Sequence, residues 1–206
     1  MKKIILILLM LFVIVILFVL KCTHRYGDNY EAIDFLKNID AYSADVEIIV
    51  KNRNQDITYN TKQIYSKEFG HVVAINQNRV LTYLDGKIYV RDLNNGKTYI
   101  QNQSFDSVFK LSFVSEYIKM LYTNEEIQYS YKYINDDEYQ LIHFLIPGTN
   151  KNINKAVLYI DTKELKPKRV YIYDIYGNKS IEVIYKNFKT NIDIDKSLFD
   201  INKHTD

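Results

Sequence analysis

The chain has 206 residues, enough for one domain with a substantial core, and its 27 Lys and Arg nearly balance 25 Asp and Glu. Residues 1–22 hold three of the lysines and no acid, which leaves 24 basic and 25 acidic groups in the rest of the chain. This near-neutral body argues against a nucleic-acid partner, and a single cysteine, Cys22, excludes an internal disulfide and a thiolate metal site.

An apolar segment follows Lys2 and Lys3 at the N-terminus. It runs from Ile4 to Leu20, and 16 of its 17 residues are Ile, Leu, Val or Phe. As a helix it would be about 25 Å long, near the lower limit for crossing a bilayer, and it lacks the polar face of a soluble helix. We therefore expect residues 1–27 to be a signal or membrane anchor and residues 28–206 to be the folded domain.

Three interpretations of this leader differ in its fate. A cleaved secretory signal would need a shorter apolar region and small residues before the cut, and these are absent. A lipoprotein signal would end in a small residue before the lipidated Cys22, but Lys21 stands there. An uncleaved membrane anchor fits best, and lipid attachment at Cys22 stays open. All three interpretations place the domain on the extracytoplasmic face.

The first half of the domain predicts one short helix and then a meander of strands. Asp28 or Asn29 can cap the helix, which we expect to run to about Ala41. Asp85-Gly86 and Asn95-Gly96 are strong hairpin signals, so neighbouring strands should be antiparallel. The expected strands in this half cover residues 46–50, 57–65, 71–75, 80–84 and 87–93.

A second helix is predicted over Ser104–Tyr122, where apolar residues recur every three and four positions. Two strands follow, over residues 127–133 and 139–146. In the first of them Tyr129, Tyr131 and Tyr133 alternate with polar residues, so one strand face carries three tyrosines. These rings either pack as core beneath a helix or form an interaction surface, for which tyrosine is well suited.

Residues 155–199 form the strongest β pattern. Strands are expected over Ala156–Ile160, Arg169–Ile175 and Ile181–Phe188, and turn residues separate them. Tyr171 and Tyr173 alternate with other apolar residues, so this block should lie in the middle of a sheet with packing on both faces. These two tyrosines are further candidates for an interaction or cavity surface. The fold class is α+β, with about ten strands and two helices.

No catalytic or cofactor motif stands out. The four histidines are scattered, and none forms a zinc-protease pair with a glutamate. Asp136-Asp137-Glu138 is expected to be a solvated turn, and no glycine-rich phosphate loop or nucleophile elbow occurs. We expect a protein that is not an enzyme and binds no cofactor and no metal.

Several short motifs resemble the LolA/LolB lipoprotein-carrier fold. The opening is Ile39–Ile48, and the closing block is Leu158–Asp161, Pro167–Val170, Gly177, Tyr185–Phe188 and Ile194–Phe199. Together with the apolar leader and Cys22, the chain is most similar to the clostridial germination lipoproteins, the GerS family. The resemblance implies a curved antiparallel half-barrel that packs on helices.

The GerS resemblance also implies a function. Proteins of that family are held at a spore membrane facing the cortex, where they bind and activate the cortex amidase CwlD. The alternative is a LolA-like carrier that holds acyl chains of lipids or lipoproteins in its concave face. A carrier needs an open apolar cavity, whereas the large residues of 155–199 favour a filled interior. A homodimer through an open sheet edge is a further expectation.

Overall fold

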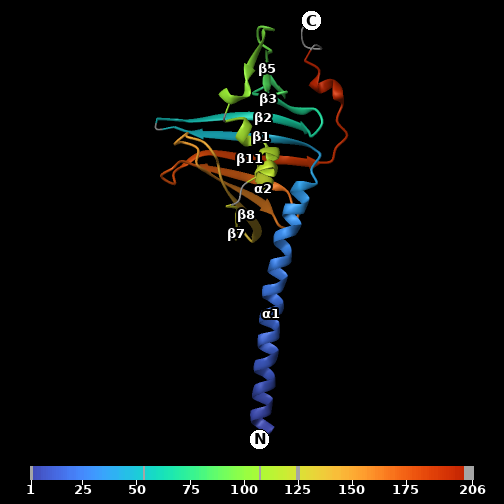
Figure 1. The fold of residues 1–206 in the computed structure, drawn as a ribbon, viewed down its shortest axis with the longest axis vertical. Coiled ribbons are helices and arrows are strands. Elements are labelled where there is room, and N and C mark those ends of the chain that lie inside the picture. Colours follow the sequence, from blue (N-terminus) through green and yellow to red (C-terminus); the bar gives the residue numbers. More distant parts are fainter. Residues whose placement is uncertain (1, 53, 107, 124–125, 202–206) are drawn as a thin grey trace.

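The main element of the computed structural model is an open antiparallel sheet of 11 strands, in the order β6-β5-β4-β3-β2-β1-β11-β10-β9-β8-β7 (Figure 1). The structure describes residues 2–52, 54–106, 108–123 and 126–201, and within these the side chains of residues 2–8, 20–30 and 105 are not described. The strands are β1 (Ala41–Lys51), β2 (Asp56–Ser66), β3 (Gly70–Ile75), β4 (Arg79–Leu84), β5 (Lys87–Asp92), β6 (Thr98–Asn102), β7 (Gln128–Ile134), β8 (Asp137–Leu145), β9 (Lys155–Asp161), β10 (Pro167–Tyr173) and β11 (Lys179–Thr190).

Two meanders build the sheet, and they join where β1 pairs with β11. Tight turns connect several strands: Asn76-Gln77, Asp85-Gly86 and Asn135-Asp136 each have two consecutive positive φ angles. This is the backbone of the two-residue hairpin turns that match the twist of antiparallel strands. The expected fold class is confirmed, with one strand more than the approximate number because β6 adds an edge after Gly96.

A single helix, α1 (Lys2–Lys37), precedes the sheet and leaves the domain as a long stalk (Figure 1). The prediction of a separate helix that starts at Asp28 or Asn29 is wrong. Extending an existing helix adds a hydrogen bond for each residue without a new nucleus, so the caps do not interrupt it. The expected boundary between residues 27 and 28 therefore falls inside a continuous helix.

Eleven apolar side chains of α1, Leu9 to Val19, are exposed to between 42% and 70%. Where side chains are described, no helix combines the length and apolarity of a membrane span.

The predicted helix over Ser104–Tyr122 is confirmed only in its second half, as α2 (Val114–Thr123). Its first half contains two short 3-10 turns, η1 (Gln103–Phe105) and η2 (Lys110–Ser112). Phe113 between η2 and α2 is extended, with φ −85° and ψ 126°. Ser112 is held from the sheet, because its hydroxyl accepts a hydrogen bond from Gln63 at 2.6 Å and its carbonyl accepts one from Tyr185 at 2.8 Å. These bonds fix the backbone where a regular helix would continue.

One face of the sheet, called the inner face, packs on α2 and on the end of α1. The largest fully buried side chains among the described residues come from the sheet and from the segments packed on it: Tyr42, Tyr117, Phe113, Phe144, Leu36, Ile48, Ile88, Ile142, Leu158, Ile160, Ile172 and Gln63. The buried Tyr42 hydroxyl joins the sheet to α2 by accepting from the Val114 amide at 3.2 Å, and the buried Tyr117 hydroxyl joins α2 to η2 by donating to the Leu111 carbonyl at 2.5 Å. Burial raises the pKa of both phenols, so both stay neutral.

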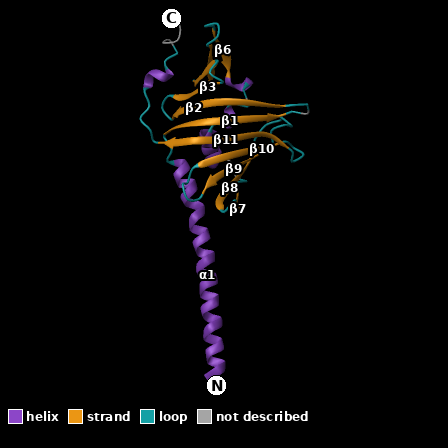
Figure 2. Cartoon of the chain, turned by 180° about the vertical axis from the view of Figure 1, so that it is seen from behind, coloured by secondary structure: helices purple, strands orange, loops and turns teal. Residues whose placement is uncertain are grey.

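The opposite face, called the outer face, is open in Figure 2, where the strands lie in front of both helices. The expectation that a layer packs on each side of residues 155–199 is therefore wrong for the described chain. The outward side chains of these strands shield one another instead, in a separate cluster around Leu141, Val157 and Tyr159. The last element of the described chain is η3 (Lys196–Phe199), where Phe199 is buried and contacts Phe69 at a ring distance of 5.7 Å.

Candidate interaction surface on the outer face

Strand register places four tyrosines on the outer face of β8, β9 and β10. Tyr171 stands opposite Val157, and both Arg169 and Leu141 stand opposite Tyr159. Directly opposed residues of antiparallel strands point to the same face. The outer face therefore gathers Tyr139, Tyr159, Tyr171 and Tyr173, which we call the tyrosine patch.

The rings of the tyrosine patch form a continuous chain across three strands. Tyr139 lies 6.3 Å from Tyr159, Tyr159 lies 5.3 Å from Tyr171, and Tyr171 lies 6.4 Å from Tyr173, measured between ring centroids. All three pairs meet edge to face, the arrangement that aromatic quadrupoles favour. This packing holds the rings in place although no helix covers them.

Two cations flank the centre of the tyrosine patch. Lys179 Nζ lies 3.5 Å from the centroid of the Tyr171 ring, and the Arg169 guanidinium donates to the Tyr171 hydroxyl at 2.6 Å. Glu182 is close to both cations, at 3.5 Å from Arg169 and 3.7 Å from Lys179. Tyr171 is thus fixed by a cation–π contact and a hydrogen bond, so little rotamer entropy remains to be lost on binding a partner.

Burial favours the neutral form of two phenols in the patch, Tyr159 and Tyr173. The pKa of Tyr159 is raised, mainly by burial and also by the neighbouring Tyr173 and Tyr171. The pKa of Tyr173 is raised, mainly by burial and also by Tyr171 and Glu182. Tyr159 and Tyr173 can therefore offer aromatic area and hydroxyl donors to a partner, but neither is favoured as a phenolate base or metal ligand.

A serine and a histidine also meet on the outer face. Ser130 Oγ lies 2.8 Å from His143 Nε2, but His143 Nδ1 is buried without a hydrogen-bond partner. A catalytic pair of this kind needs a third group that orients the imidazole ring. The pKa of His143 is lowered, mainly by burial and also by the charge of Lys155. Among the described residues, no group of three or more His, Cys, Asp and Glu is placed to hold a metal ion.

The candidate residues named from the sequence are divided between the two faces of the sheet. Tyr171 and Tyr173 belong to the tyrosine patch. Tyr129 and Tyr131 stand opposite Ile142 and Gln140, so the ladder of the edge strand β7 lies on the inner face. Tyr129 is 41% exposed and Tyr133 is 61% exposed, so the ladder is not core beneath a helix.

Sequence reasoning missed the other members of this surface, which are the patch residues Tyr139 and Tyr159 and the flanking cations Arg169 and Lys179. The only signal for them would have been the register between β8, β9, β10 and β11. The side chain of Cys22 lies outside the described residues.

Two open grooves run along β1 on the outer face, with volumes of about 770 and 800 Å³. Both are lined by Asp45 and Lys62, and the first is also lined by Glu47 and Lys186, which form an ion pair at 2.8 Å. Charged walls of this kind suit a polar ligand or a protein surface and disfavour an acyl chain.

A family model described as YdcC, sporulation protein YdcC-like, matches residues 1–199. No curated protein matches the sequence significantly. Among solved structures, an uncharacterized conserved protein from Thermus thermophilus is similar with a TM-score of 0.53 and 10% identity, covering 82% of this chain and 91% of that chain.

Two further solved structures are more distant. One is the CwlD amidase from Clostridioides difficile in complex with the GerS lipoprotein, with a TM-score of 0.44 and 21% identity, covering 82% of this chain and 95% of that chain. The other is a LolA superfamily protein from Nitrosomonas europaea, with a TM-score of 0.43 and 10% identity, covering 83% of this chain and 96% of that chain. At these identities a likeness concerns the fold and not the activity.

Proposed function

Because the chain belongs to the family of YdcC-like sporulation proteins, we propose that it is a non-catalytic protein anchored on the extracytoplasmic face of a spore membrane. There it binds and activates a cell-wall amidase of the CwlD type, which modifies the spore cortex for germination. The observation that carries this proposal is the tyrosine patch, an ordered aromatic surface on a sheet face without a covering layer.

The composition of the patch supports a protein partner. Tyrosine and arginine are enriched among the residues that dominate binding energy at protein interfaces. The four tyrosines of the patch lie beside Arg169 and Lys179, and the carboxylate of Glu182 pairs with both cations. A mixed aromatic and paired-charge surface suits a folded protein better than a strongly anionic polymer.

The amidase as partner is taken from the resemblance of the opening and closing motifs to the GerS family. In Clostridioides difficile, the GerS lipoprotein forms a complex with the CwlD amidase. Here the edges of the described sheet, β6 and β7, are also open, and a second copy of the chain would pair there.

The proposed anchor is the apolar segment Ile4–Leu20. Insertion of such a segment is favoured by roughly 5–10 kcal/mol on the biological insertion scale. The exposure of Leu9 to Val19 leaves these apolar side chains available to lipid. Cys22 is the proposed attachment point for a lipid in the alternative form of the anchor.

The packing of the inner face speaks against the alternative function as an acyl-chain carrier. The segment from Leu111 to Tyr117 packs on the inner face together with the end of α1, and Gln63, Tyr42 and Tyr185 hold it there by hydrogen bonds. A chain of 12 or more methylenes would have to displace these fully buried groups, and each broken buried hydrogen bond would cost about 1–3 kcal/mol.

Binding of the amidase can be tested with variants of the patch. We expect Tyr171→Ser and Tyr173→Ser, made separately in the full chain, to weaken amidase binding about 30-fold, the loss typical of an interface hot spot. The measurement is amidase recovered with the tagged chain from sporulating cells, followed by titration with the purified amidase.

Tyr133→Ser is the matched control, because Tyr133 is an exposed strand tyrosine on the inner face. It should bind the amidase as the unmodified chain does. If all three variants bind equally, the tyrosine patch is not the docking surface. If the unmodified chain recovers lipid and no amidase, the carrier function stands in its place.

A further inference from the structure

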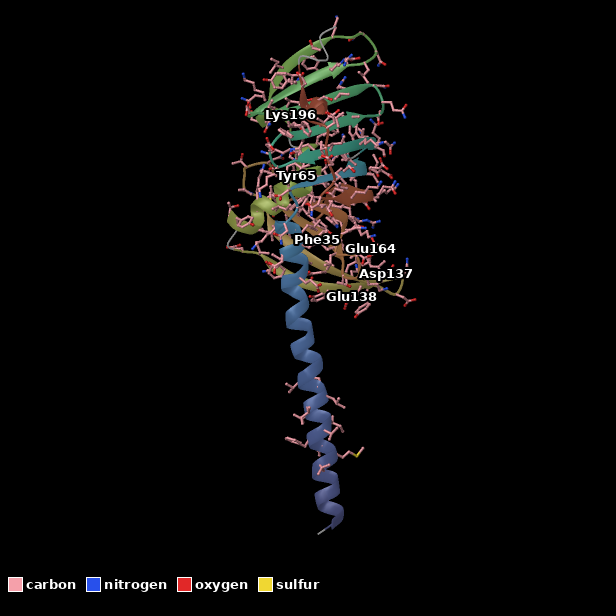
Figure 3. The ribbon with its side chains drawn as sticks, turned by 90° about the vertical axis from the view of Figure 1, so that its right-hand side faces the viewer. Phe35, Tyr65, Asp137, Glu138, Glu164 and Lys196 are labelled. Atoms are coloured by element: carbon pink, nitrogen blue, oxygen red, sulfur yellow. The ribbon has the colours of Figure 1, made fainter. Side chains whose placement is uncertain are left out.

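The helix that carries the apolar segment also forms part of the domain core. Ala32 and Leu36 of α1 are almost completely inaccessible, at 1% and 0%, and Ile33 is 8% exposed. All three pack in the inner-face cluster with the sheet. Figure 3 shows Phe35 where α1 enters the domain. A flexible linker is therefore absent from the described backbone between the stalk and the sheet, since α1 runs from Lys2 to Lys37 without a break.

Polar contacts fix the joint between α1 and β1 from three directions. Lys37 Nζ lies 5.0 Å above the ring of Tyr122 in α2. The Asp40 carbonyl accepts from the Lys67 amide at 2.8 Å, and the Asp40 carboxylate pairs with the Lys67 ammonium at 3.0 Å. The Asp40 amide in turn donates to Asn191 Oδ1 at 3.4 Å. Rotation of the helix against the sheet would disturb contacts to α2, to Lys67 just after β2 and to Asn191 just after β11.

The strands of the sheet follow one another in a fixed order along the direction of the stalk. Figures 1 and 2 show β7 and β8 at the end of the domain from which the N-terminal part of α1 projects, and β5 and β6 at the far end. In Figure 3, Asp137 and Glu138 of β8 likewise lie nearer the stalk than Lys196. At a spacing of about 4.8 Å, 11 strands separate the two edges by up to about 48 Å.

We propose that α1 is a rigid stalk that holds the sheet upright on the membrane, with the β7 edge toward the bilayer and the β6 edge away from it. This inference rests on the proposed anchoring through Ile4–Leu20. Residues 21–31, between that segment and the first buried residue, span about 16 Å as a helix. The tyrosine patch lies one to three strands above the β7 edge, so it faces sideways within about 30 Å of the hydrocarbon boundary. The partner that this height fits is a protein held at the same membrane.

The orientation can be measured because the chain contains no tryptophan. Tyr133→Trp places a single tryptophan at the β7 edge, and Tyr99→Trp places one at the β6 edge, where Tyr99 is 43% exposed. Each full-length variant is reconstituted in phosphatidylcholine vesicles that contain a dansyl-labelled phosphatidylethanolamine. We expect severalfold stronger energy transfer to the dansyl lipid from residue 133 than from residue 99. Equal transfer from the two positions would overturn the upright stalk.

Flotation of the same vesicles tests the membrane anchor separately from the rigid stalk. A chain that floats but transfers equally from both positions keeps its anchor and lacks the rigid stalk. A chain that does not float has neither. As a positive control for rigidity, eight Gly-Ser residues inserted after Gly27 should abolish the difference between the two positions.

Whether the partner is held at the same membrane can be tested by moving the tyrosine patch farther from the bilayer. Insertion of 14 helix-forming residues after Gly27 adds four turns, which lifts the domain by about 21 Å and nearly restores its rotational phase. We expect severalfold less amidase to be recovered from sporulating cells with this variant, although its tyrosine patch is intact. Unchanged recovery would show that the partner is not confined to the same membrane.

Discussion

At Gly70 the backbone enters β3 with a φ of +93°, a conformation that residues with a side chain rarely adopt. A Cβ atom there would also overlap with the carbonyl oxygen of Tyr83 on β4. We expect Gly70→Ala to lower the free energy of unfolding by about 2–4 kcal/mol, the sum of backbone strain and a backbone clash. The measurement is thermal unfolding of the full chain in detergent, followed by circular dichroism.

Gly86 provides the matched control, because it has a φ of +74° but no atom within 4 Å of the position that a Cβ would take. Gly86→Ala should show the conformational cost alone, about 1–2 kcal/mol. Equal losses at the two glycines would mean that the Tyr83 carbonyl moves freely out of the way.

His71 is a buried histidine that the fold keeps neutral. Its ring stacks on Phe113 at 4.1 Å, and its Nε2 lies 2.7 Å from the hydroxyl of Ser115. Burial, followed by the charge of Lys119, lowers the pKa of His71 to about 3. Since the unfolded chain titrates near 6.5, the unfolded state binds the extra proton below that pH. The stability that His71 contributes is thus complete above pH 6.5 and decreases as the pH falls toward 3.

This linkage predicts a measurable slope. Between pH 6.5 and 5, His71 should lower the free energy of unfolding by up to about 1.4 kcal/mol per pH unit. We expect His71→Gln to be less stable at pH 7 and to have a flatter pH dependence in this window. His143→Gln is the control, because His143 is only partly buried and should contribute less. If the free energy of unfolding changes with pH in the same way for the unmodified chain and for His71→Gln, His71 is not the source of the pH dependence.

At the level of elements, the strands and their tight turns follow from local sequence. Asp85-Gly86 predicts a hairpin because only residues that tolerate positive φ fit its turn, and the structure has that turn. The alternation of β1 is also visible in the sequence, since Val46 and Ile48 are buried while Asp45 and Glu47, which alternate with them, are partly exposed. Such features need no knowledge of distant parts of the chain.

The faces of the tyrosine strands could not be predicted in this way. Tyr129 alternates with polar residues and lies on the inner face, whereas Tyr171 alternates with apolar residues and lies on the outer face. The side on which a strand places its odd residues depends on its register with the next strand, and a shift by one residue reverses it. Local pattern therefore identifies the tyrosines but not their grouping into one patch.

The helix predicted over Ser104–Tyr122 failed in its first half for a tertiary reason. Its apolar spacing is helical, but Asp106 accepts hydrogen bonds from the Phe109 amide and from the Tyr83 hydroxyl of β4. Together with the bonds to Ser112, these contacts favour short turns that insert Phe113 between His71 and Tyr83. Packing on the sheet overrides helix propensity here, which contributes only tenths of a kcal/mol for each residue.

At the scale of the whole molecule, the leader and the domain share one helix. The expected domain boundary at residue 28 can therefore be tested by asking which residues of this helix the core needs for stability. A chain of residues 28–206 keeps Ala32, Ile33, Leu36 and Ile39, which pack against the inner face. A chain of residues 38–206 loses the first three. Removing two large buried side chains costs about 2–5 kcal/mol each, and a typical domain is stable by only about 5–15 kcal/mol.

We therefore expect the 28–206 chain to unfold cooperatively and the 38–206 chain to expose its inner face. The measurements are thermal unfolding by circular dichroism and binding of a hydrophobic dye at about 20 °C. Leu36→Ala in the 28–206 chain should give an intermediate result, because it removes one buried side chain and keeps the helix. If the two truncated chains melt at the same temperature, the end of α1 is not part of the core, and the rigid joint between membrane and sheet loses its physical basis.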